Sequence, residues 1–199
     1  ILANQRAHHC QQVFSSSIAA KTALIIGLGD LGQAAARAAK DLDLKVIGVS
    51  RGGKKVRHTD AVYTTSQLDA LLPQADYVVM AVPLTPETRC FLNRTRLDLM
   101  KPTAGVINIA RAQVADHEAL AEKLRRAELA GAVLDVMDPE PLPPESPLWE
   151  VPNLIITPHI SCDDSERYVD ITLDLWFENL ERLLQGKPLK SRVEQRRGY

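Results

Sequence analysis

Short apolar runs alternate with segments of helical periodicity from residue 22 to residue 157. The predicted strands are 22–27, 45–50, 77–82, 105–110, 131–136 and 153–157, and the predicted helices between them are 31–42, 66–72, 94–100 and 116–128. The strands are continuous apolar runs rather than alternating ones, which is typical of strands covered by helices on both faces. Strand–helix alternation of this kind predicts an α/β fold with a doubly wound parallel sheet.

Two further helices are predicted outside this alternating region. Residues 2–17 are polar and rich in glutamine, and we expect a helix that ends in a serine cluster. Residues 163–185 have an amphipathic pattern that places Val169, Leu173 and Trp176 on one face. We expect Trp176 to pack in a core or an interface. The remaining tail, 186–199, is polar and looks extended.

The composition argues against several classes of protein but does not indicate a function. The 199 residues carry a formal net charge of −1, which gives no sign of a nucleic-acid or polyanion binder. The three cysteines are far apart in the sequence, so a disulfide framework or a zinc site is not expected and a cytoplasmic protein fits best. No apolar run approaches the ~20 residues that a membrane span requires. No metal site is predicted.

The loop after the first predicted strand has the spacing GxGxxG. Gly27 permits a tight turn, Gly29 lets a diphosphate approach the backbone, and Gly32 lets the following helix pack close to the strand. The strand before the motif and the helix after it are the context that supports dinucleotide binding. The helix N-terminus offers N–H groups and partial positive charge to phosphates. The motif therefore predicts a Rossmann-type nucleotide-binding domain.

The second strand lacks the acidic residue that usually binds the adenosine ribose. Ser50 stands at its end and Arg51 follows, with further basic residues in the loop. A carboxylate here would repel a 2′-phosphate, whereas a guanidinium binds phosphate well. We therefore expect NADP(H) to be preferred, with NAD(H) possible. The alternative is a solvated basic loop with no contact to the cofactor.

Four stretches after predicted strands carry a family resemblance: AVPLTPET (81–88), VINIARAQVADHEAL (106–120), GAVLDVMDPEPL (131–142) and NLIITPHIS (153–161). In this order and spacing they resemble the D-isomer-specific 2-hydroxyacid dehydrogenases, from about Ala20 to the C-terminus. The resemblance implies a nucleotide-binding domain paired with a flavodoxin-like substrate domain.

The resemblance also implies three catalytic residues. Arg111 matches the substrate-binding arginine, Glu140 the family's carboxylate and His159 its acid/base histidine. These residue types suit the reduction of a 2-oxoacid. A guanidinium can bind the carboxylate and polarise the ketone, and a histidine can donate the proton that the oxygen requires. A carboxylate beside that histidine stabilises the imidazolium and fixes its tautomer.

Further cofactor contacts follow from the same resemblance. Asp30 and Leu31 would present backbone N–H groups to the diphosphate, and Asp135 would hydrogen-bond the carboxamide, with a strand-end cap as the alternative. The remaining predicted contacts lie around the nicotinamide and its ribose: Val82, Pro83, Thr88, Ile109 and Ala110. One departure is Ala112, where the family usually has glycine, and a methyl group is tolerable there if φ stays negative.

Within the family, EPLPPESPLW (140–149) and the terminal RRGY look like the glyoxylate/hydroxypyruvate reductase group, which often prefers NADPH. The leading interpretation is therefore NADPH-dependent reduction of a small 2-oxoacid to the D-2-hydroxyacid. One alternative is a family member that oxidises another small acid such as phosphite, and Glu140 argues against formate because formate dehydrogenases have glutamine there. Another is a dinucleotide-sensing binding protein of the corepressor type.

The resemblance also bears on what lies outside this sequence. Family members carry a longer segment before the opening helix, which builds most of the substrate domain. We therefore expect residues 1–160 to form the dinucleotide-binding domain and 161–199 to form a crossing helix and a tail that returns to the substrate domain. This chain alone should bind cofactor but reduce little substrate. A homodimer is expected because the nucleotide-binding domain makes the family's dimer interface.

Overall fold

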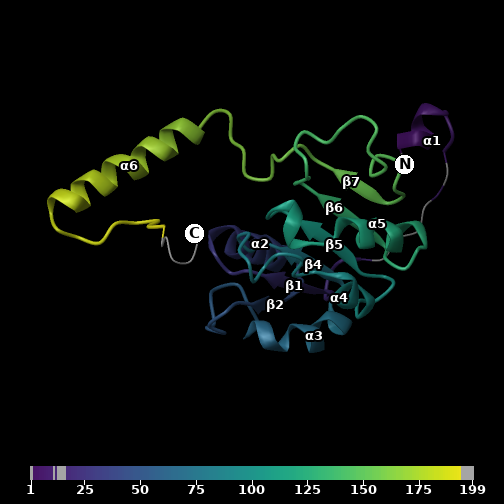
Figure 1. Cartoon of the computed structure of the whole chain (residues 1–199), viewed down its shortest axis with the longest axis horizontal. Coiled ribbons are helices and arrows are strands. Elements are labelled where there is room, and N and C mark those ends of the chain that lie inside the picture. The colour runs from purple at the N-terminus through teal and green to yellow at the C-terminus, as the bar shows by residue number, and fades with distance from the viewer. Residues whose placement is uncertain (1, 11, 13–16, 194–199) are drawn as a thin grey trace.

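A computed structural model describes residues 2–10, 12 and 17–193. Within them, seven parallel strands form one sheet in the order β3-β2-β1-β4-β5-β6-β7 (Figure 1). The strands are β1 (Thr22–Ile26), β2 (Lys45–Val49), β3 (Ala61–Tyr63), β4 (Tyr77–Met80), β5 (Gly105–Asn108), β6 (Gly131–Leu134) and β7 (Leu154–Ile156). The helices are α1 (Leu2–Arg6), α2 (Asp30–Asp41), α3 (Leu68–Leu71), α4 (Arg94–Asp98), α5 (His117–Arg125) and α6 (Tyr168–Leu184). The predicted doubly wound parallel sheet is confirmed.

The strand order reverses between β1 and β4, which are hydrogen-bonded neighbours in the sheet. Chain connections on the two sides of this point run in opposite directions, so the loops after β1 and β4 diverge at the carboxyl edge of the sheet. In open α/β sheets a ligand binds in the crevice at such a switch point. The topology therefore predicts where the site lies before any side chain is considered.

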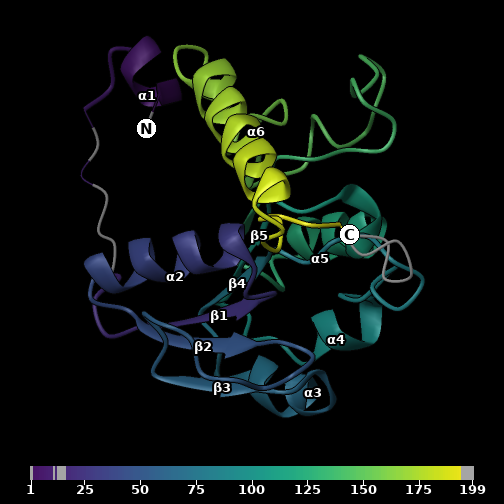
Figure 2. The same ribbon diagram turned by 90° about the vertical axis from the view of Figure 1, so that its left-hand side faces the viewer.

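Successive residues of the central strands point to opposite faces of the sheet, and each face has its own helices. Leu24 and Ile26 are fully buried in the larger core, which includes residues of α3, α4 and α5. Ile25 belongs to a smaller core, where it packs with Ala36 of α2. Figure 2 shows α2 on one side of the sheet and α3 and α4 on the other. Burial on both faces explains why the strands read as continuous apolar runs.

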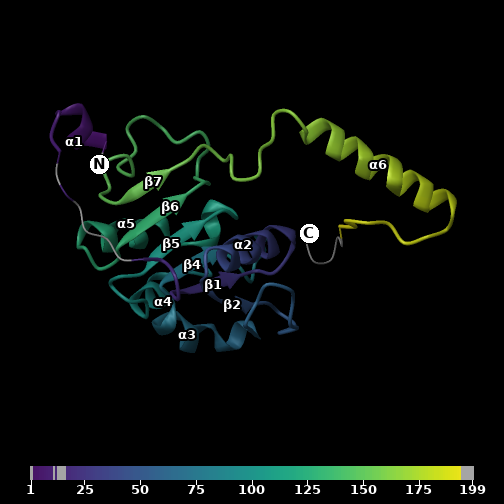
Figure 3. The ribbon, with the colours of Figure 1, turned by 180° about the vertical axis from the view of Figure 1, so that it is seen from behind.

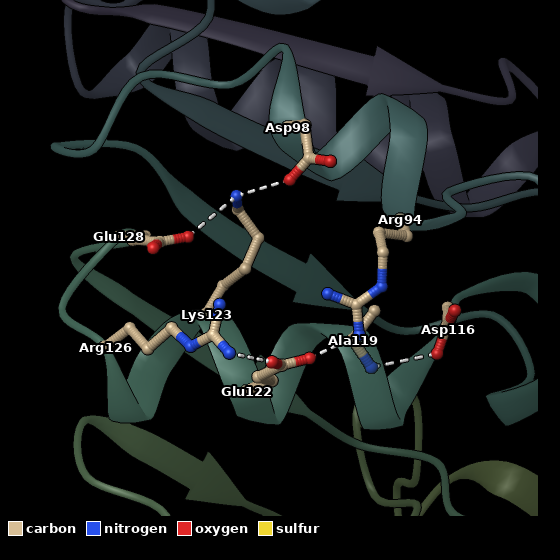
Figure 4. A network of polar contacts seen from close by, with 8 residues as sticks. All are labelled: Arg94, Asp98, Asp116, Ala119, Glu122, Lys123, Arg126 and Glu128. Atoms are coloured by element: carbon tan, nitrogen blue, oxygen red, sulfur yellow. Dashed lines mark hydrogen bonds and ion pairs between the residues drawn. The ribbon is translucent and has the colours of Figure 1, made fainter.

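Polar contacts join α4 to α5 at the edge of the larger core (Figure 4). Lys123 is only 7% exposed, and its Nζ lies 2.7 Å from Asp98 Oδ1 and 3.2 Å from Glu128 Oε2. Glu122 forms ion pairs with Arg94 of α4 and with Arg126. The buried lysine is thus paired with two carboxylates, as a buried charge requires.

Three predictions about individual elements need correction. The N-terminal helix spans Leu2–Arg6 rather than 2–17, and residues 11 and 13–16 of the predicted range lie outside the described residues. The predicted helix 66–72 is a short α-helix, α3, between two 3₁₀ turns, and Pro73 lies in the second turn. Strand β3 was not predicted, since three residues in a polar context give no periodic signal.

Helix α6 leaves the body of the domain, as Figures 1 and 3 show from opposite sides. None of its residues is buried, and its apolar side chains are widely exposed, including Trp176 at 57% and Leu184 at 80%. The Trp176 and Phe177 rings contact each other edge to face, with centroids 5.0 Å apart. Trp176 is therefore not part of a core within this chain, and the alternative of interface packing stays a prediction.

Candidate active site

A groove of about 990 Å³ lies at the switch point of the sheet. It is lined by the loop after β1 (Gly27–Gly29), the loop after β2 (Ser50–Gly52) and the loop after β4, including 81–88. All three loops leave the carboxyl ends of parallel strands. The predicted cofactor residues Gly27, Gly29, Ser50, Arg51, Val82, Pro83 and Thr88 are among those that line this groove.

Glycine stands at the three motif positions for different structural reasons. Gly27 has φ +98°, and a Cβ there would lie 2.4 Å from the carbonyl oxygen of Ala81. A Cβ on Gly32 would lie 1.8 Å from the carbonyl oxygen of Gly27, so α2 can approach β1 only without a side chain. A Cβ on Gly29 would meet nothing within 4 Å. Gly27 and Gly32 are thus required by packing, whereas Gly29 leaves space in the groove.

The N-terminus of α2 opens onto that space. Gly29 is the N-cap and provides no side-chain hydrogen bond, and Asp30 and Leu31 are the first two helical residues. The N–H groups of a first helical turn have no partners within the helix, which suits them to an anionic ligand. The diphosphate of a dinucleotide fits this place, because the space beside Gly29 is open and the helix N-terminus offers N–H donors.

Away from the N-terminus of α2, the groove is lined by one positive and one negative side chain. Arg51 and Glu87 both line it, one after β2 and the other after β4. The pKa of the Glu87 carboxyl is lowered, chiefly by a hydrogen bond from the Thr85 side chain, and the positive charge of Arg51 contributes. Arg51 is therefore close enough to act on Glu87 across the groove. Glu87 was not predicted as a site residue, although it lies in the stretch 81–88 that carries the family resemblance.

The loop after β4 is held rigid by Thr88. Its Oγ1 donates to the Pro83 carbonyl oxygen at 2.6 Å and accepts from the Thr85 backbone N–H at 2.7 Å. The start of the loop also lines a second cavity, of about 380 Å³, together with Leu31. That cavity is bounded on its other side by Ile109, Ala110 and Arg111. The two cavities share residues 81–84, so the groove continues from Ser50 toward Arg111.

Glu140 and His159 come together from the loops after β6 and β7. His159 Nδ1 lies 3.0 Å from Glu140 Oε2, while Glu140 Oε1 accepts the Met137 backbone N–H at 2.7 Å. The pKa of Glu140 is lowered, first by the hydrogen bond with His159 and next by the one from Met137. The positive charge of Arg111 lowers it further, so Arg111 lies within electrostatic reach of the pair. The structure brings together all three residues predicted to be catalytic.

Arg111 follows β5 at the rim of the second cavity, and its Nη1 donates to the Ala110 carbonyl oxygen at 2.6 Å. Ala112, the departure from the family pattern, is buried and begins a 3₁₀ turn that extends to Val114. The methyl group is accommodated in this helical turn. The next side chain, Gln113, donates from Nε2 to Asp138 Oδ2 at 2.6 Å. This bond joins the Arg111 loop to the loop that carries Glu140.

Asp135 is buried and accepts hydrogen bonds from the loop that carries His159. Its Oδ1 accepts from Thr157 Oγ1 at 2.5 Å and from the Ile160 N–H at 2.9 Å, and its Oδ2 accepts from the Ser161 N–H at 2.9 Å. Burial raises its pKa, but these hydrogen bonds outweigh burial and the net pKa is lowered. This geometry is that of the strand-end cap considered as the alternative; a carboxamide contact stays a prediction.

The bonds to Asp135 offset a local backbone strain. His159 has φ +56°, which is uncommon for a residue other than glycine, and its own N–H donates to the Thr157 carbonyl oxygen at 3.1 Å. Such conformations persist where surrounding contacts fix them, and they gather at functional sites. The three donors to Asp135 lie on both sides of His159, so they hold the loop that carries it.

Two further residues of the site were not identified from the sequence. Asn108 is fully buried at the end of β5, and His117 is half-buried at the start of α5. They contact each other, and Asn108 also bonds the backbone of Arg111. The one signal in the sequence was an asparagine inside an apolar run, GVINIA.

The described residues contain neither a metal-binding cluster nor a membrane-spanning helix. In residues 2–10, 12 and 17–193, no group of three or more His, Cys, Asp or Glu side chains is arranged to hold a metal ion. Over the same part of the chain, no helix has the length and apolarity needed to span a membrane.

Comparisons with known proteins agree with this geometry. The family model for the D-isomer specific 2-hydroxyacid dehydrogenase NAD binding domain matches residues 2–161. A glyoxylate reductase of Pyrococcus furiosus is 42% identical over 140 residues, which are 70% of this chain and 41% of that protein. A D-3-phosphoglycerate dehydrogenase of Synechocystis is 35% identical over 183 residues, 92% of this chain and 33% of that protein. The chain thus spans less than half the length of these two relatives.

Solved structures give the same result. A D-isomer specific 2-hydroxyacid dehydrogenase of Xanthobacter autotrophicus, in complex with NADPH and MES, aligns with a TM-score of 0.88 at 36% identity and covers 100% of this chain and 81% of that one. An NADPH-dependent glyoxylate/hydroxypyruvate reductase of Sinorhizobium meliloti, in complex with NADP and sulfate, has a TM-score of 0.89 at 32% identity and covers 100% of this chain and 63% of that one. The chain belongs to the NAD-binding domain family of the D-isomer specific 2-hydroxyacid dehydrogenases.

Proposed function

We propose that the protein containing this chain reduces a small 2-oxoacid of the glyoxylate or hydroxypyruvate type to the D-2-hydroxyacid, with NADPH as hydride donor. The observation that carries the proposal is the hydrogen-bonded His159–Glu140 pair, which feels the positive charge of Arg111, the residue at the end of a groove that fits a dinucleotide. The similarity to glyoxylate reductases supports the choice of substrate class.

The chain's own residues divide the chemistry among them. Arg111 binds the substrate carboxylate with its fork of N–H donors and polarises the ketone oxygen. Glu140 bonds His159 at Nδ1, which leaves Nε2 as the nitrogen that donates a proton to the oxygen as it becomes a hydroxyl. The bound cofactor supplies the hydride for the carbonyl carbon. Asp135 holds the His159 loop in position.

Residues around the groove would hold the cofactor. The first turn of α2, from Asp30 and Leu31, binds the diphosphate, and Gly29 leaves room for it. Ser50 and Arg51 bind the adenosine ribose and its 2′-phosphate, which favours NADPH. Val82, Pro83, Thr88, Ile109 and Ala110 line the path toward Arg111, where the nicotinamide and its ribose would lie. Two relatives of known structure with NADPH or NADP bound support this cofactor.

The proposal is tested by steady-state rates of the protein that contains this chain. Glyoxylate, hydroxypyruvate and pyruvate are each assayed with NADPH and with NADH, and NADPH affinity is measured separately. We expect turnover of glyoxylate or hydroxypyruvate, with higher kcat/KM for NADPH than for NADH. Equal or better rates with NADH would contradict the cofactor preference. Tight NADPH binding without turnover of any 2-oxoacid would contradict the enzymatic function.

A further inference from the structure

The buried amide of Asn108 organises the loop that carries Arg111. Its Oδ1 accepts the Ala110 backbone N–H at 3.1 Å, and its Nδ2 donates to the Arg111 carbonyl oxygen at 3.0 Å. A backbone N–H can only donate and a carbonyl can only accept, so these two partners fix the orientation of the amide. Asn108 is 0% exposed, and a buried amide is costly unless its groups are bonded.

The second hydrogen of Nδ2 is directed at His117, whose Nε2 lies 3.3 Å away. Because the orientation of the amide is fixed, His117 Nε2 must be the acceptor. The ring is therefore neutral and carries its proton on Nδ1. If Nε2 carried a proton, two N–H donors, one on Asn108 and one on His117, would face each other and the hydrogen bond would be lost. The protonation state of the His117 ring is thus linked to the Arg111 backbone by the buried side chain of Asn108.

The surroundings of His117 act on its ionisation in both directions. Burial is the largest effect and lowers its pKa from the ordinary value of 6.5, whereas the negative charges of Asp116 and Asp138 oppose the shift. Asp116 is the N-cap of the same helix, α5, and Asp138 belongs to the loop after β6. These are the charged groups found to act on the ring within the described residues. The ring is thus neutral at neutral pH and gains its proton only in acid.

We propose that His117 is a positioning residue that, through Asn108, holds the Arg111 loop in the form that binds the 2-oxoacid carboxylate. The proposal rests on the proposed function of Arg111. It makes substrate affinity dependent on whether the His117 ring can accept a hydrogen bond. The residue is not placed in contact with substrate, so it acts on the reaction only through the position of Arg111.

Two substitutions separate this role from a merely structural one. His117→Gln keeps an acceptor near the position of Nε2 but cannot titrate. His117→Phe keeps the ring shape but has no acceptor, which leaves an Asn108 N–H unsatisfied. Exposed His9 provides the control, His9→Gln. KM and kcat for glyoxylate are measured at saturating NADPH from about pH 5 to about pH 8, the range in which histidine titrates.

In the wild type, KM should rise as pH falls through the lowered pKa of His117. His117→Gln should lack this rise, and His117→Phe should keep KM on the order of tenfold above the neutral-pH wild-type value at every pH. All other residues are the same in these proteins, so the difference between the KM profiles isolates His117. Identical KM profiles for wild type and His117→Gln, or a His117→Phe protein with unchanged KM, would overturn the proposal.

A measurement without substrate keeps this inference separate from the proposed function. The ¹⁵N shifts of the His117 ring should show the Nδ1–H tautomer at neutral pH. The backbone ¹⁵N of Ala112, which shares its peptide with the Arg111 carbonyl, should titrate together with His117 in the wild type and stay constant in His117→Gln. These results without oxoacid turnover would support the coupling and reject the proposed reaction. An Nε2–H tautomer, or an Ala112 signal that does not follow His117, would overturn the inference even in an active enzyme.

Discussion

Single residues decide where the groove can hold a ligand and which ligand it favours. Gly29 and Gly32 belong to the same motif, yet only Gly32 is required by packing. Arg51 faces a carboxylate, Glu87, across the same groove, so the cation that would attract a 2′-phosphate works against a nearby negative charge. We therefore expect the preference between the two cofactors to depend on a local balance of charge rather than on one residue type.

The glycines give a matched pair of substitutions. Gly29→Ala should leave the free energy of unfolding within roughly 1 kcal/mol of the wild type, because the new methyl meets nothing within 4 Å, while NADPH binding weakens at least about tenfold. Gly32→Ala should lower stability strongly, since its methyl would overlap the Gly27 carbonyl oxygen. Urea unfolding and fluorescence titration with NADPH measure the two effects. A stable Gly32→Ala protein, or unchanged NADPH affinity in Gly29→Ala, would contradict these roles.

Arg51→Ala should weaken NADPH binding about tenfold to hundredfold, the size expected for a charge-assisted contact, and change NADH binding little. The loss is reinforced because the positive charge of Arg51, which acts on Glu87, would then be removed. Dissociation constants for both cofactors test this by calorimetry. Arg57→Ala, in the same loop but outside the groove lining, is the control. Equal losses for both cofactors would show that Arg51 only supports the loop.

At the scale of elements, the packing between helices α4 and α5 includes a buried lysine that two exposed carboxylates keep charged. Burial alone would lower the Lys123 pKa, but Asp98 and Glu128 reverse this effect and raise it. Replacing such a charge with an apolar side chain costs little, whereas removing its partner leaves a buried charge poorly compensated. Figure 4 shows why: both carboxylates converge on one ammonium group.

Lys123→Met should therefore change the free energy of unfolding by less than about 1 kcal/mol, while Asp98→Ala should lower it more. The Asp98 pKa is lowered by the hydrogen bond from Lys123, so this stabilisation exists above the ordinary value of 3.8 and is lost as pH falls through the lower folded value. Asp98→Ala and wild type should thus converge in strong acid. Denaturant unfolding across pH measures both effects. A larger loss for Lys123→Met at neutral pH would contradict this explanation.

Sequence patterns predicted the elements whose signal is local and missed those set by distant contacts. The core strands were read correctly because burial on both faces makes each one a continuous apolar run. Strand β3 has three residues, and its pairing with β2 has no counterpart in its own pattern. Motif order and family resemblance predicted Arg111, Glu140 and His159. The bonds of Asn108 and Asp135 could not be predicted, because spacing does not reveal which buried donors a polar side chain meets.

At the scale of the whole molecule, the sheet with its covering helices is a folded body and α6 projects from it. The exposed apolar side chains of α6 are typical of a helix that packs against another part of a protein. Its contact with a substrate domain, the homodimer and the predicted boundary at residue 160 stay predictions. What the structure does show is that the body does not depend on α6 for its core.

A chain shortened to residues 1–167 should therefore keep the unfolding midpoint and NADPH affinity of the full chain. A chain shortened to 1–158 should be less stable by roughly 1–3 kcal/mol, because Asp135 loses the Ile160 and Ser161 N–H groups and keeps a buried carboxylate. Thermal unfolding monitored by circular dichroism compares the two. A large loss of stability in the 1–167 chain, or equal stability of both shortened chains, would contradict the conclusion that the folded body is independent of α6.

In the proposed reaction this domain brings a proton donor and a hydride donor to one 2-oxoacid, and a single comparison tests this most directly. The kcat/KM for glyoxylate with saturating NADPH is measured for wild type and His159→Gln, in the protein that contains this chain. We predict measurable wild-type turnover and a decrease of about 10²- to 10⁴-fold in His159→Gln, with unchanged NADPH affinity. A His159→Gln protein that reduces glyoxylate at the wild-type rate would contradict the claim.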